Sequence, residues 1–117
     1  MKSTKNTDTE KISVEKLLVR CGISPKLQGF DFLAKAVSIY SIGRDRKISD
    51  VYSEIGESIG YSEHKVHNYA DYALGSSPTV CAFINETLGT DYLPYQLQNK
   101  RAVALLAICH NTLNNRR

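Results

Sequence analysis

The sequence predicts an all-α protein of about six helices, and three observations support that class. Apolar residues recur at helical spacing through most of the chain, glycines or capping residues separate the periodic segments, and no stretch alternates apolar and polar residues as a half-buried strand does. With 117 residues, 42% of them hydrophobic, the chain is long enough for one domain with its own core. We expect a disordered polar tail at 1–10, a folded domain at 11–114 and a basic tail at 115–117.

The first two helices are expected at 13–21 and from Ser24 to about Ile42. Ser13 is the expected first residue of the first of them, and Gly22 is its expected stop. Ser24-Pro25 fits an N-cap followed by proline at the first helical position of the second, which Gly43 closes. Both segments carry apolar stripes at helical spacing: Val14, Leu17, Leu18 and Cys21, then Leu27, Phe30, Leu33, Val37 and Tyr40.

Two short helices joined by a glycine turn are expected between residues 48 and 75. The first places Val51, Ile55 and Ile59 on one face, and Gly60 ends it because glycine enters the left-handed conformation without steric cost. Ser62 is the candidate N-cap of the second helix, which ends at Gly75 and buries Val66, Ala70 and Ala73. A short helix, a tight turn and a second helix are the parts of the DNA-binding helix-turn-helix, whose second helix reads the major groove.

The rest of the chain predicts two more helices with a loop between them. Ser76-Ser77-Pro78 is a capping signal for a helix with Val80, Phe83, Ile84 and Leu88 that Gly89 ends. The segment 90–98, with its proline, is expected to be an extended packed loop. Asn99 is the candidate cap of a last helix from Lys100 to about Leu113, with an apolar side made of Val103, Leu106, Ala107 and Leu113.

Composition argues against several functional classes. No apolar run approaches the roughly 18 residues of a membrane span, and the polar N-terminus lacks a secretory segment, so we expect a cytoplasmic protein with no membrane partner. Cys21, Cys81 and Cys109 lack metal-ligand spacing and are expected to be buried structural thiols. No phosphate loop, nucleophile elbow or carboxylate pair is present, so we expect no enzyme activity, no catalytic residue, no cofactor and no metal.

The charge distribution does not favour DNA binding by the helix pair alone. The chain has a net charge of +3, but residues 48–75 contain five acidic residues and one lysine, a balance of −4 that leaves +7 for the rest. Attraction to phosphate must therefore come from outside the pair. The candidates are Ser62 at the cap and two basic groups, one of Arg44, Arg46 and Lys47 and one of Lys100 and Arg101.

Candidate base contacts lie on the second helix of the pair. A rotation of about 100° per residue gives a buried stripe of Val66, Tyr69, Ala70 and Ala73. On the opposite face lie His64, Lys65, Asn68, Asp71 and Tyr72, with His67 on the flank. Asparagine can bond adenine bidentately, lysine can reach guanine acceptors and histidine can donate to bases or phosphates. We therefore expect base contacts from His64, Lys65, His67 and Asn68. The alternative is an ordinary solvated helix face, because glycine-linked helix pairs are common in all-α proteins.

Three segments resemble one known family. They are LLVRCGISPKLQGFDFLAKAV, VYSEIGESIGYSEHKVHNYADYA and NKRAVALLAI, and the most specific piece is the G-I-x-x-x-x-x-G-[FY]-x-[FY]-L block from Gly22 to Leu33. They are similar to the C-terminal DNA-binding effector domains of the response regulators that initiate sporulation in endospore-forming bacteria. The similarity covers roughly 17–113.

The resemblance implies a six-helix, all-α DNA-binding domain. Family members carry a receiver domain in front, whereas only a short polar tail precedes the first helix here, so we expect a free-standing effector domain. The family's Ser-Arg-Val-Glu-Arg pattern at the second helix is replaced by His64-Lys65-Val66-His67-Asn68, which implies a different DNA site.

The resulting hypothesis is a sequence-specific transcriptional regulator that binds double-stranded DNA and could do so as a homodimer on tandem or paired sites. The alternative is a protein-interaction module whose helix-turn-helix has lost DNA affinity and binds another regulator. The −4 balance of the pair favours the alternative. The polar face of its second helix favours DNA, because protein interfaces usually centre on large apolar or aromatic anchors.

Overall fold

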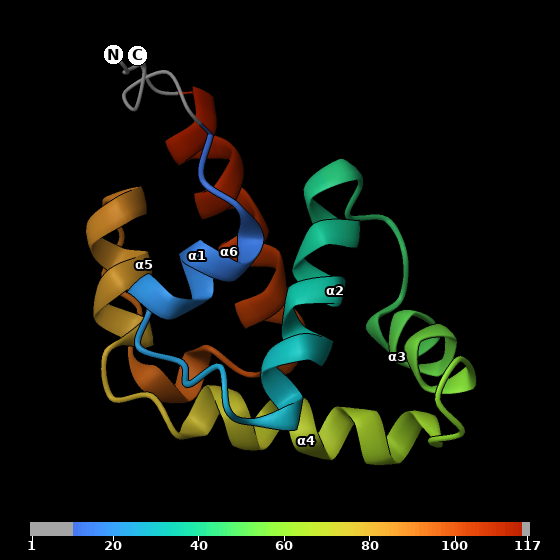
Figure 1. Ribbon diagram of the computed structural model, residues 1–117. Helices are drawn as coiled ribbons and strands as arrows, with labels where there is room; N and C mark the ends of the chain where they lie inside the picture. Colours follow the sequence, from blue (N-terminus) through green and yellow to red (C-terminus); the bar gives the residue numbers. More distant parts are fainter. Residues whose placement is uncertain (1–10, 116–117) are drawn as a thin grey trace, which may run out of the picture.

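The computed structural model describes residues 11–115 and confirms the all-α class (Figure 1). The tail predicted at 1–10 and residues 116–117 of the predicted basic tail lie outside the described residues. Between residues 11 and 115 the chain forms six α-helices, one 3-10 turn and no strand. Their bounds are α1 (Val14–Arg20), α2 (Gln28–Ile42), α3 (Ile48–Glu57), α4 (Glu63–Gly75), α5 (Val80–Leu88), η1 (Pro94–Gln96) and α6 (Asn99–Asn115).

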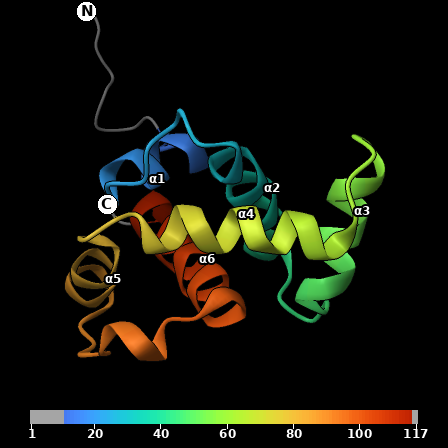
Figure 2. The same cartoon turned by 90° about the horizontal axis from the view of Figure 1, so that it is seen from below.

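The helices pack around a central pair made of α2 and α6. In Figure 1 these two helices stand side by side, and α4 runs across below them in contact with both. Helix α3 packs against α4 and α2, while α1 covers α2 and α5 covers α6. Viewed from below, in Figure 2, α4 lies nearest the reader with its outer side uncovered by any other helix. The fold therefore presents α4 at one face of the domain.

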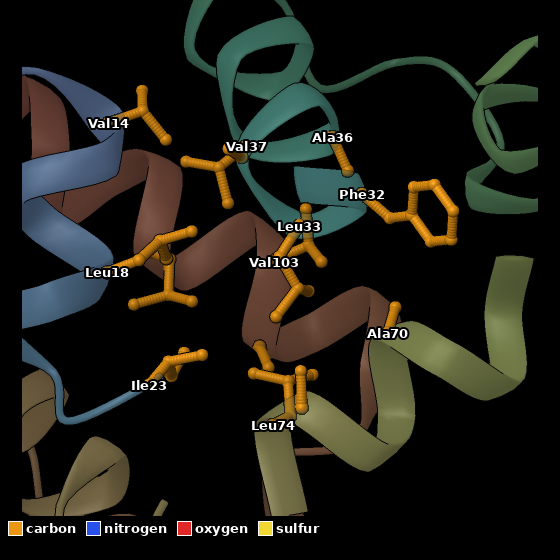
Figure 3. Packing of buried hydrophobic residues seen from close by; sticks show 14 of the residues in the cluster. Val14, Leu18, Ile23, Phe32, Leu33, Ala36, Val37, Ala70, Leu74 and Val103 are labelled. Atoms are coloured by element: carbon orange, nitrogen blue, oxygen red, sulfur yellow. The ribbon is translucent and has the colours of Figure 1, made fainter. Parts of the chain in front are cut away.

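The predicted apolar stripes form one core. Figure 3 shows Leu18 of α1, Leu33 and Val37 of α2 and Val103 of α6 pointing toward one another. Ile59 departs from the predicted stripe and is 42% exposed. Helix α3 ends at Glu57, and Gly60 then turns the chain with φ +77°, so Ile59 no longer shares the buried face of Val51.

Four expected features at helix ends differ from the structure. Ser24-Pro25 does not start α2: Ser24 accepts from the Leu27 backbone N–H (3.3 Å) in a turn, and the helix begins at Gln28. Ser77 turns inward and donates to the Cys21 carbonyl (2.7 Å), which leaves Thr79 at the N-cap of α5. The loop at 90–98 contains the 3-10 turn η1, and Asn99 is the first residue of α6, with its side chain bonded elsewhere.

Two of the three cysteines are buried as expected. Burial raises the pKa of the Cys21 thiol to about 12, with a further contribution from nearby Cys109, and burial raises that of Cys109 to about 11. Such thiols stay protonated at neutral pH and act as small apolar side chains. Cys81 is only partly buried, and its Sγ donates to the Tyr92 carbonyl (3.3 Å).

Candidate nucleic-acid interface

The turn between α3 and α4 orients the first residues of α4. The Tyr61 N–H donates to the Gly56 carbonyl (2.9 Å), and a Cβ at Gly56 would collide with the Tyr61 carbonyl. Ser62 then caps α4 as predicted, its Oγ accepting from the Lys65 N–H (3.1 Å). The local sequence thus sets where α4 begins and which way its first turn faces.

Helix α4 exposes a polar face. His64, Lys65, Asn68 and Tyr72 are exposed, while Val66, Ala70 and Ala73 are buried, as the helical periodicity predicts. The Lys65 Nζ lies 4.0 Å from the centroid of the Tyr61 ring, a cation–π distance that positions the ammonium near the start of the helix. Tyr72 is 66% exposed, one turn beyond Asn68.

His67 and Asp71 form a pair on the flank of this face. The His67 Nε2 lies 3.0 Å from the Asp71 Oδ2, and the imidazole packs edge-to-face on the Tyr52 ring of α3 (centroids 5.6 Å apart). His67 is therefore less free than His64 to turn toward a ligand. Asp71 is expected on the outward face. Its Oδ2 instead turns toward His67, one turn earlier on the same helix.

A chain of hydrogen bonds links this pair to α6. The Tyr52 Oη donates to the Asn99 Oδ1 (2.7 Å), and the Asn99 Nδ2 donates to the Asp71 Oδ1 (2.5 Å). Burial raises the pKa of Tyr52 above its usual range, the Asp71 charge raises it further, and the Asn99 hydrogen bond opposes both. The sequence did not predict these hydrogen bonds. The one signal for them was Tyr52, a tyrosine beside Val51 on the buried side of an amphipathic helix.

The structure brings one of the two basic groups close to α4. Lys100 and Arg101 are exposed, and together with His67, Asp71 and Asn99 they line a surface depression beside the start of α3. Figure 2 shows α6 crossing behind α4.

The other basic group is divided. Lys47 is the N-cap residue of α3, next to Ile48, which lines the same depression. Arg46 pairs with Glu54 (3.2 Å), and its carbonyl accepts from the Tyr40 hydroxyl (2.7 Å). Arg44 lies beside Asn111 and its neighbours near the other end of α6, and ten helical residues separate Asn111 from Arg101, a rise of about 15 Å. Arg44 therefore lies away from the end of α6 that meets α4.

Other kinds of site receive no support from the described part of the chain. Across residues 11–115 no three His, Cys, Asp or Glu side chains gather as a metal site would require. None of the described helices combines the length and apolarity needed to cross a bilayer. Comparison with family models, with curated proteins and with solved structures gave no match for this chain.

Proposed function

We propose that this protein is a sequence-specific regulator of transcription that binds double-stranded DNA with α4 in the major groove. The observation that carries the proposal is the outer face of α4, where His64, Lys65 and Asn68 are exposed on a helix that begins after a short turn from α3. The major groove admits an α-helix, and these side chain types can bond base edges. The resemblance to sporulation-regulator effector domains is consistent with this assignment.

Each candidate has a role that its chemistry suits. Asn68, in the middle of the outer face, can pair with the two major-groove atoms of adenine, and Lys65 or His64 can reach a base or a phosphate near the start of α4. Lys100 and Arg101 sit beside α4, where they can contact the phosphates that flank the groove. The other phosphate candidates are Ser62 at the N-cap of α4 and the basic residues before α3, Lys47, Arg46 and Arg44.

The acidic balance of residues 48–75 is the main objection, and one ion pair offsets part of it. Glu54 is paired with Arg46 (3.2 Å), a basic residue outside that segment. Lys100 and Arg101 add positive charge at the edge of the same surface. Of the other acids, Asp50 and Glu57 are exposed on α3, whereas half-buried Glu63 is the first residue of the proposed reading helix α4.

The same acidic balance favours one other function, a protein-interaction module that binds another regulator through α3 and α4. Exposed Tyr72 and Ile59 would then supply apolar contacts. The two functions differ in their response to salt and to nucleic acid. DNA binding requires released counterions and an affinity that falls steeply as salt rises.

The test is selection of bound fragments from a random duplex pool, followed by titration of the selected duplex at several salt concentrations. The double variant Lys100→Ala/Arg101→Ala should lower the log–log salt slope by about 1.8 if each side chain contacts one phosphate. The matched control is Lys16→Ala/Arg20→Ala, which removes the same charge from the exposed side of α1. A wild-type protein that retards no duplex at low salt would overturn the proposal and favour the interaction module.

A further inference from the structure

We propose that Asp71 is a positioning residue that holds the base-reading helix and the phosphate-binding end of α6 in one register, and is not an acid that faces the DNA. This inference rests on the proposed function. In this inference one carboxylate connects the outer face of α4 to the start of α6, and both parts must contact the duplex at the same time.

The geometry that carries the inference is a bridge through both carboxylate oxygens. Oδ1 accepts from the Asn99 Nδ2 at 2.5 Å, and Oδ2 lies 3.0 Å from the His67 Nε2. Asn99 is only 7% exposed, and its side-chain oxygen, Oδ1, accepts from the hydroxyl of fully buried Tyr52. One carboxylate on α4 is thereby connected to α6 and, through Asn99, to α3.

The bridge has a direct effect on the candidate DNA contacts. Asn99 is followed immediately by Lys100 and Arg101, so the side chain that Asp71 holds is the one that anchors the first turn of α6. On α4, Asp71 lies one turn beyond Asn68, whose side chain is exposed. Fixing Asn99 against Asp71 therefore fixes the separation between the base-reading side chain and the phosphate-binding pair. Simultaneous contacts to a base and to phosphates require that separation to be constant.

The charge of Asp71 opposes DNA binding, whereas its bridge supports it, so the two effects can be separated by mutation. The groups that face the His67–Asp71 pair are Tyr52 from α3 and Asn99, Lys100 and Arg101 from α6. Asp71→Asn removes the charge but keeps the shape: its carbonyl can accept from Asn99, and its amide can donate to a neutral His67. Asp71→Ala removes the charge and the bridge together.

The experiment compares the affinities of wild type, Asp71→Asn and Asp71→Ala for the selected duplex and for a scrambled duplex. Asp71→Asn should tighten binding to both by a similar factor and keep the ratio between them. Asp71→Ala should also bind scrambled DNA more tightly, but its ratio should fall by at least tenfold. The Asp71 side chain is half exposed and alanine favours helix, so both variants are expected to fold, which thermal unfolding will check.

A second readout needs no DNA. In NMR spectra of the free protein, the side-chain amide signals of Asn99 should move less in Asp71→Asn, which keeps an acceptor, than in Asp71→Ala, which removes it. Tyr52→Phe keeps every charge and removes the hydrogen bond from Tyr52 to Asn99. It should also lower the ratio of affinities for the selected and the scrambled duplex.

Three results would overturn the inference. An Asp71→Ala protein that keeps the full ratio would show that the bridge does not position the contacts. Equal loss of the ratio in Asp71→Asn and Asp71→Ala would assign the effect to the charge. A wild type that prefers no duplex would remove the proposed function itself, a failure that is visible before any variant is compared.

Discussion

The crossing of α2 over α4 leaves no room for a side chain at Gly29, and Gly29→Ala tests how α4 is held in place. Gly29 is the second residue of α2 and is buried. An added Cβ would collide with the carbonyl oxygen of Tyr69 and would lie 2.9 Å from the Ala73 Cβ, both on α4. Neither neighbour can move aside by changing a side-chain torsion, because one is backbone and the other a methyl group. The two helices must therefore separate.

The size of the effect follows from two opposing contributions. Alanine is a better helix former than glycine, which favours the variant by up to about 1 kcal/mol. Forcing an extra methyl into a packed contact typically costs about 1–3 kcal/mol, and a backbone collision belongs at or above the upper end of that range. We expect a net loss of about 2 kcal/mol, which for a domain near 100 residues lowers Tm by roughly 8–16 °C.

The assay is thermal unfolding followed by circular dichroism, with Gly75→Ala as the matched control. Gly75 is the last residue of α4, and a Cβ there would meet no atom within 4 Å. The control should therefore be neutral or more stable than wild type by up to about 1 kcal/mol. If Gly29→Ala unfolds at the same temperature as Gly75→Ala, the close approach of α2 to α4 is wrong.

Two further predictions concern alkaline stability and base recognition. The folded protein holds the Cys21 proton up to a pKa of about 12, against 9.0 for an ordinary cysteine, so the free energy of unfolding is full below pH 9 and falls as the pH rises toward 12. Urea unfolding between pH 8 and 11 should show this fall, and Cys21→Ala should make it shallower; an equally steep fall in the variant would contradict the cause assigned. In DNA titrations, Asn68→Ala should cost roughly 1–3 kcal/mol on the selected duplex and little on a scrambled one. An Asn68→Ala protein that keeps the full preference would show that Asn68 reads no base.

Local chemistry allowed much of the fold to be read from the sequence. The cap at Ser62 and the stops at Gly22, Gly60 and Gly89 were predicted correctly, and all three glycines have a positive φ. Each depends on atoms within a few residues, so the local sequence contains the whole interaction. Val66, Ala70 and Ala73 of the predicted stripe on α4 are buried and Tyr69 is half-buried, since the helical period decides which residues share a face.

The tertiary structure decided which polar side chains were free to act. Ser77 and Asn99 both stand where a helix cap is expected, yet Ser77 bonds the Cys21 carbonyl and Asn99 bonds Tyr52 and Asp71. These partners are distant in sequence, and a buried donor or acceptor takes whichever partner packing brings to it. The same packing placed Lys100 and Arg101 beside α4 and left Arg44 near the far end of α6. By itself, then, the sequence determined where most helices begin and end and which residues face the core. The candidate interface, including the role inferred for Asp71, depended on side chains that only the folded chain brings together.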